Sequence, residues 1–148
     1  MNHRLEPTST TPTAIPDEAA LEISLRPQGL RDFVGHEHIK DALGLMLAAA
    51  KRRSEPVDHI LFHGPPGTGK TTLSWIVANE MGVPMRELSA PAIRRPGDLA
   101  AVLVSLARGQ VLFLDEVHAL ATESAEMLYS GIEDYRISLI TGRGEDAT

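Results

Sequence analysis

The feature that most constrains the fold is an eight-residue run at positions 64–71, which reads Gly-Pro-Pro-Gly-Thr-Gly-Lys-Thr. It fits the pattern G-x-x-x-x-G-K-S/T. The apolar run His59–His63 comes directly before it and predicts a buried strand, and the helical spacing of Leu73, Ile76 and Val77 follows it. A glycine-rich turn between a strand and a helix is typical of a phosphate-binding loop. The alternative is a structural turn with an incidental lysine.

The residue types of this run match the chemistry of binding phosphate groups. Glycines let backbone N–H groups turn inward and approach phosphate oxygens closely, and the helix that follows adds its positive N-terminal end. We expect Lys70 to reach the β- and γ-phosphates of a nucleotide, the Thr71 hydroxyl to bind Mg²⁺ and Thr72 to contact the α-phosphate. The candidate phosphate-binding residues are Gly64, Gly67, Gly69, Lys70, Thr71 and Thr72.

A second candidate site follows the apolar run 111–114, which predicts a buried strand that delivers Asp115 and Glu116 to its carboxyl end. In open α/β sheets ligands bind at the carboxyl ends of strands, so this pair is expected near the loop. We expect Asp115 to hold Mg²⁺ through water, and Glu116 to be catalytic by polarising the water that attacks the γ-phosphate. The second carboxylate favours a hydrolase over a kinase, because a kinase must exclude water.

The rest of the chain alternates between helical and strand patterns. Apolar spacing predicts helices over 36–53, 70–81 and 123–133, Gly82 is a candidate C-cap, and Asp98 can cap a further helix that reaches Leu106. Strands are predicted at 85–89 and 137–140 besides the two already named. Residues 1–24 lack apolar periodicity and are predicted to be a disordered leader. This alternation favours an α/β domain with a mostly parallel sheet.

Composition narrows the function classes. The chain has 148 residues, with 14 Lys+Arg, 20 Asp+Glu and a formal net charge of −6. A surface with this overall negative charge is expected to bind DNA or RNA poorly. No apolar run approaches the ~20 residues needed to span a bilayer, so no membrane span is expected. The absence of cysteine excludes disulfides and fits a reducing cytosol, and the six histidines show no metal-ligand spacing.

Beyond these motifs, several stretches carry a family resemblance from about residue 25 to about residue 144. The chain resembles the AAA+ ATPases and, among them, the RuvB family, the ATP-driven motors of bacterial Holliday junction branch migration. The narrowest signals are the Pro-Gly-Asp-Leu-Ala-Ala stretch at 96–101 and the Glu-Asp-Tyr stretch at 133–135. The resemblance also rests on Leu-Arg-Pro at 25–27, on Asp-Phe-Val-Gly at 32–35, and on the stretches 63–73, 78–82, 91–93 and 112–118.

The resemblance implies a P-loop (AAA+) core with ATP and Mg²⁺ as cofactors. It implies that Leu25 and Arg26 border the adenine and ribose, and that Glu133, Asp134 and Tyr135 lie beside the nucleotide. The partners it implies are a RuvA-like junction-binding protein, a four-way DNA junction and further copies of the chain in a hexameric ring, all in the cytoplasm. Two positions depart from the family. His36 stands where the family usually has Gln, and Ala119 stands where it usually has Arg.

Length is the largest departure, because the family continues with a sensor strand, an arginine finger, a helical lid and a winged-helix DNA-binding domain. We therefore expect residues 25–148 to be the N-terminal part of a truncated ATPase domain and the chain to be a fragment, inactive alone. The resemblance places a fourth strand between the first and the third. Without it, unpaired strand groups are expected to cost ~1–3 kcal/mol each.

Two other functions are compatible with the sequence. One is a different AAA+ ATPase of DNA metabolism, such as a clamp-loader-like protein, which the 96–101 stretch disfavours. The other is a non-motor nucleotide-binding module or a phosphate-loop kinase, which Glu116 disfavours.

Overall fold

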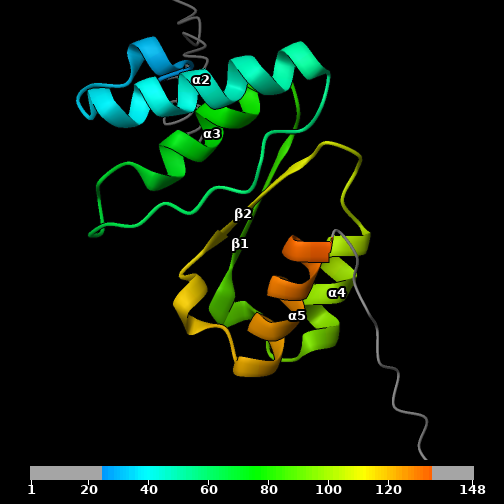
Figure 1. Cartoon of the computed structure of the whole chain (residues 1–148). Coiled ribbons are helices and arrows are strands. Elements are labelled where there is room, and N and C mark those ends of the chain that lie inside the picture. Colours follow the sequence, from blue (N-terminus) through cyan, green and yellow to red (C-terminus); the bar gives the residue numbers. More distant parts are fainter. Residues whose placement is uncertain (1–24, 135–148) are drawn as a thin grey trace, which may run out of the picture.

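The computed structural model describes residues 25–134 of the chain (Figure 1). Its elements alternate between helix and strand, as the sequence pattern predicts. In chain order they are η1 (Leu30–Asp32), α2 (Glu37–Arg53), α3 (Lys70–Met81), β1 (Met85–Ser89), η2 (Ala90–Ala92), α4 (Pro96–Val104), β2 (Val111–Asp115), η3 (Val117–Ala119) and α5 (Thr122–Asp134).

The two strands form a parallel pair connected through α4. Met85 lies opposite Val111 at one end of the ladder, and Ser89 lies opposite Asp115 at the other. Parallel strands need such a helical crossover, because their starts lie at the same end of the sheet. The register therefore places the carboxyl ends of both strands at the same edge, and Asp115 ends β2 there.

The main core joins α2 and α3 and extends to the sheet. Helical spacing brings Leu43 and Leu47 of α2 against Leu73 and Ile76 of α3, and all four side chains are buried. This is the apolar stripe that the sequence predicts for both helices. Because α3 packs against β2 as well as α2, the core fixes the start of α3 relative to the acidic strand end.

An ion pair also ties these two helices together. The Lys51 Nζ of α2 lies 3.0 Å from the Glu80 Oε2 of α3, and this hydrogen bond from the ammonium lowers the pKa of Glu80 below its ordinary value. Both groups are partly exposed, so the pair contributes at most about 1 kcal/mol to stability.

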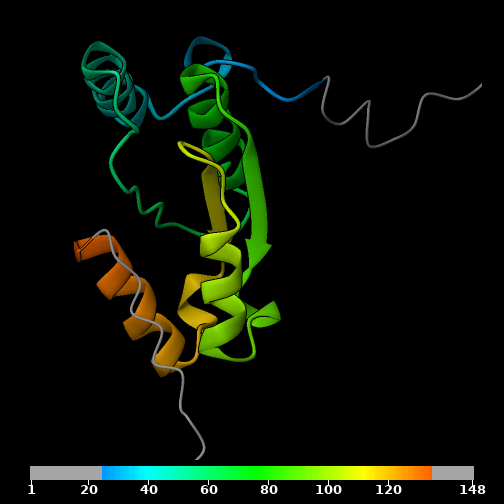
Figure 2. The same cartoon turned by 90° about the vertical axis from the view of Figure 1, so that its right-hand side faces the viewer.

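The second helical pair is α4 with α5, which lie in the lower half of the molecule in both views, while α2 and α3 lie in the upper half (Figures 1 and 2). The Asp98 carboxylate, at the third residue of α4, accepts hydrogen bonds from the N–H groups of Arg94 and Arg95. Asp98 thus stabilises this helix start from inside the first turn, and α4 ends at Val104, before Leu106.

Two strand predictions need correction. The segment 59–63 forms no ladder with β1 or β2, although Ile60 and Phe62 pack against the core while Leu61 is 78% exposed. A strand needs a hydrogen-bonding neighbour, and no described strand lies beside this segment. The strand β2 does pair with β1, but all five of its residues are half-buried rather than buried. The predicted leader 1–24 and strand 137–140 lie outside the described residues.

Within residues 25–134, no helix combines the length and the apolar character that crossing a membrane requires.

Candidate functional site

The predicted phosphate loop connects the segment 55–63 to α3. Gly67 has φ +77° and Gly69 has φ +88°, a region that residues with a Cβ rarely adopt. The Thr68 hydroxyl donates a hydrogen bond of 2.9 Å to the Pro65 carbonyl within the loop. The glycines at 67 and 69 are therefore required by the turn itself, as the motif predicts.

The Lys70 side chain folds back over this loop. Its Nζ donates hydrogen bonds to the carbonyl oxygens of Gly64, at 2.9 Å, and Pro65, at 2.8 Å. The ammonium is thus held above the loop backbone.

The start of α3 leaves backbone donors open toward the loop. Gly69 precedes the helix and has no side chain that could cap it. The N–H of Leu73 pairs with the Gly69 carbonyl, at 2.8 Å, whereas the first-turn N–H groups of Lys70, Thr71 and Thr72 have no acceptor among residues 25–134. Such open donors, together with the positive end of the helix dipole, favour binding of an anion.

The loop rests on the core through Phe33, a contact that sequence reasoning missed. A Cβ built on Gly69 would lie 2.8 Å from Phe33 Cζ and 2.9 Å from Phe33 Cε2. Phe33 is 8% exposed and belongs to the main core cluster. No local pattern could have indicated a contact between residues 36 positions apart, although Phe33 lies in the Asp-Phe-Val-Gly stretch at 32–35.

This contact predicts different outcomes for alanine at two loop glycines. Gly69→Ala should destabilise the chain by about 2–4 kcal/mol, because positive φ costs ~1–2 kcal/mol and the new methyl displaces a packed ring. Gly67→Ala is the matched control, since its φ is similar and, apart from its chain neighbours, no atom of residues 25–134 lies within 4 Å of the position that the new Cβ would take. Chemical unfolding of both variants measures the difference, and equal losses would contradict the packing argument.

At the carboxyl end of β2 the two acidic residues differ in environment. Asp115 is half-buried, and its Oδ1 accepts the N–H of Glu116 at 2.8 Å. Glu116 is exposed and has φ +53°, a left-handed conformation that is uncommon for a side chain of this type. Strain of this kind persists where the surrounding structure holds it, and it clusters at functional sites.

The loop and this strand end lie on the same side of the molecule. In Figure 1 the loop is at the left, the side toward which the carboxyl end of β2 points, and α3 packs on β2. No hydrogen bond within residues 25–134 joins the loop to Asp115 or Glu116.

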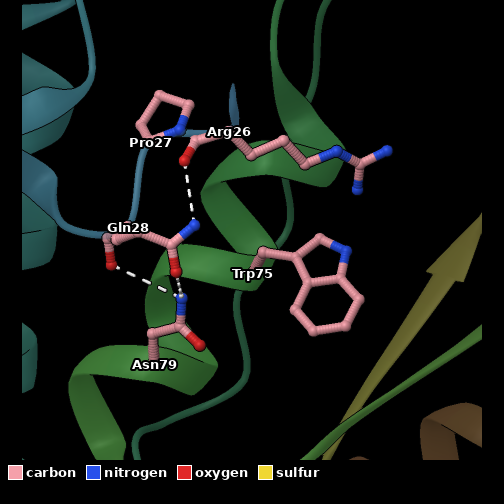
Figure 3. A pocket seen from close by; sticks show the side chains of 5 residues that line it. All are labelled: Arg26, Pro27, Gln28, Trp75 and Asn79. Carbon is pink, nitrogen blue, oxygen red and sulfur yellow. Dashed lines mark hydrogen bonds between the residues drawn. The ribbon is translucent and has the colours of Figure 1, made fainter. Parts of the chain in front are cut away.

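The other residues that are predicted to contact the nucleotide lie outside the loop. Arg26 is half-buried and lines a small pocket on α3 (Figure 3), whereas Leu25 beside it is 81% exposed. Figure 1 shows the end of α5, which carries Glu133 and Asp134, across the strands from the loop. The structure does not bring this end of α5 to the loop, and Tyr135 lies outside the described residues.

Comparison with known proteins decides the family. Residues 25–148 match the family model described as the Holliday junction DNA helicase RuvB P-loop domain. The chain belongs to the RuvB family. A P-loop domain implies nucleotide binding, and the glycine-rich loop at 64–71 lies within the matched residues.

Curated relatives and solved structures agree with this assignment. The chain is 49% identical over 143 residues to the Holliday junction branch migration complex subunit RuvB of Pseudarthrobacter chlorophenolicus, and 52% identical over 132 residues to that of Acidothermus cellulolyticus. These matches cover 97% and 89% of this chain but 40% and 36% of the relatives. The RuvB branch migration motor of Thermotoga maritima aligns with a TM-score of 0.72 at 50% identity, over 75% of this chain and 37% of that one.

The chain therefore spans about two fifths of the length of these curated relatives. Family membership supports the P-loop fold and the parallel sheet that the sequence predicts, and it disfavours the clamp-loader-like and kinase readings. It leaves the roles of individual side chains to be argued from their chemistry.

Proposed function

We propose that this chain supplies the ATP-binding part of a motor subunit for Holliday junction branch migration. The observation that carries the proposal is the open start of α3 behind the glycine loop, on the side of the molecule where the acidic end of β2 lies. A RuvB family member with this arrangement can hold a nucleotide at the loop before α3 and direct a water molecule onto it from the carboxyl end of β2. The cytoplasm is the compartment that fits such a role.

The residues of the chain fit ATP with Mg²⁺. In this proposal the Lys70 ammonium exchanges its two loop carbonyls for phosphate oxygens, while the first-turn N–H groups bind the same phosphates. Thr71 is half-buried at the start of α3, and together with Asp115 it offers the hard oxygen donors that Mg²⁺ prefers. Bound there, the ion would neutralise negative charge on the phosphates.

Glu116 is the proposed catalytic base. Its carboxylate is exposed at the turn after β2, so it can accept a hydrogen bond from a water molecule. Asp115, whose Oδ1 is engaged by the backbone, is the better candidate for a fixed ligand. We propose that Leu25 and Arg26 border the base and sugar and that Glu133, Asp134 and Tyr135 approach the nucleotide.

The proposed partners follow from the relatives. Because these are named subunits of a Holliday junction branch migration complex, we propose a RuvA-like junction-binding protein, a four-way DNA junction and a homo-hexameric ring. The net charge of −6 makes this chain an unfavourable DNA ligand by itself, so the proposal assigns junction contact to a partner or another domain.

A chimera tests the proposed function. Residues 25–148 replace the matching part of the Pseudarthrobacter chlorophenolicus relative, and ATP-driven dissociation of a synthetic four-way junction is measured with RuvA. We expect activity within about tenfold of the relative, stimulated by RuvA but not by a sliding clamp. A folded chimera that binds ATP but never moves the junction would contradict the motor assignment.

A further inference from the structure

A pocket on α3 carries residues that the phosphate chemistry does not use. It is lined by Arg26, Pro27, Gln28, Trp75 and Asn79 (Figure 3). The Gln28 Nε2 donates to the Arg26 carbonyl at 2.9 Å, and the Asn79 Nδ2 donates to the Gln28 carbonyl at 3.4 Å and to Gln28 Oε1 at 3.3 Å. The two Asn79 bonds join the segment 26–28 to α3, so the pocket has one wall from each of them.

Trp75 is the unusual member of this pocket. It is the single tryptophan of the chain, and it stays half-buried while the α3 residues on either side of it, Ser74 and Ile76, are buried. Its Nε1 is covered but has no hydrogen-bond acceptor among residues 25–134. A large aromatic ring that stays half-buried, with a covered donor that finds no acceptor within residues 25–134, is not explained by packing alone.

The position of Trp75 on α3 relates the pocket to the phosphate loop. Thr72 and Trp75 are three residues apart and therefore share one face of the helix. Trp75 follows Lys70 by five residues, which corresponds to about 7.5 Å along the helix axis. This is the scale of the sugar that separates a nucleoside base from its phosphates.

The side chains of Arg26 and Trp75 lie on one side of the pocket. Figure 3 shows Arg26 and Trp75 extending in the same direction, with Gln28 and Asn79 at the other end of the pocket. The Arg26 guanidinium has no ion-pair partner within the described part of the chain. One flat aromatic ring and one guanidinium without an ion-pair partner in residues 25–134 therefore line the same pocket.

From this arrangement we propose that Trp75 is a base-contacting residue, against whose indole the base of the bound nucleotide stacks. Asn79 and Gln28 act as positioning residues, which hold the segment 26–28 opposite the indole. The inference rests on the proposed nucleotide binding and adds the group that recognises the base rather than the phosphates.

The test compares a nucleotide with its phosphate part alone. The 148-residue chain and its Trp75→Ala, Trp75→Phe and Tyr129→Ala variants are titrated with ADP and with inorganic pyrophosphate, each with Mg²⁺, by calorimetry. We expect Trp75→Ala to weaken ADP binding about tenfold, since stacking on an aromatic ring is lost, and to leave pyrophosphate binding unchanged. Trp75→Phe should retain most of the affinity. Tyr129→Ala, which removes an aromatic ring that is 62% exposed on α5, should bind both ligands as the parent chain does.

Tryptophan emission of the parent chain gives a second readout, because only Trp75 contributes to it. We expect ADP to change the emission and pyrophosphate to leave it unchanged. The proposal is overturned if Trp75→Ala binds ADP as tightly as the parent, or, should that variant not fold, if saturating ADP leaves the parent emission unchanged. If the parent chain binds neither ligand, the proposed nucleotide binding fails and the inference fails with it. Binding of both ligands with no effect at Trp75 overturns the inference alone.

Discussion

Replacing Lys70 by alanine should weaken ATP binding by about 100-fold. In the structure the Lys70 Nζ donates two hydrogen bonds of 2.8–2.9 Å to loop carbonyls, so the ammonium lies over the loop that we propose to bind the phosphates. Hydrogen bonds from a charged donor contribute about 1.5–3 kcal/mol each, and alanine provides none. Calorimetric titration of the 148-residue chain with ATP and Mg²⁺ measures the loss directly.

Lys51→Ala is the matched control for this substitution. It removes the same side chain from the end of α2, where the ammonium pairs with Glu80 and not with the loop. We expect unchanged ATP affinity and a loss of at most about 1 kcal/mol in stability. If Lys70→Ala keeps its affinity while its melting curve matches that of the parent chain, Lys70 does not bind phosphate.

Helical periodicity located most of the fold correctly. It predicted α2, α3 and α5 to within one residue at each end, because each has one apolar face whose spacing of three and four depends only on local geometry. The strand at 59–63 was predicted wrongly from the same kind of local signal. Its apolar residues do face the core, but a strand is defined by a neighbour, which no single segment can reveal.

The candidate site was predictable where the chemistry resides in one motif. The glycine-rich turn before α3 and the acidic end of β2 lie where the patterns placed them. Contacts between distant segments were not predictable, as the Phe33–Gly69 packing shows. The Trp75 pocket was missed for the same reason, because its walls come from positions about 50 residues apart. The roles of the individual site residues remain predictions that the experiments described here test.

Glu116→Gln should abolish ATP hydrolysis and leave ATP bound. Glutamine matches the size of glutamate, so it can take the same place in the turn after β2, where φ is +53°. Its amide cannot accept a proton from water, and loss of a positioned base costs about 10²–10⁴ in rate. The chimera with the Pseudarthrobacter chlorophenolicus relative provides the hydrolysis assay, since it supplies the remaining part of that motor.

Glu123→Gln in the same chimera separates loss of the base from loss of negative charge. Glu123 is an exposed carboxylate in the first turn of α5, only seven residues further along the chain. We expect Glu123→Gln to leave the rate of ATP hydrolysis unchanged. Glu116→Gln should still bind ATP but should not hydrolyse it. A Glu116→Gln chimera that hydrolyses ATP at the parent rate would assign the base to another residue. Because Asp115 is already bonded through Oδ1 to the Glu116 N–H, Asp115→Asn would then be the next variant to examine.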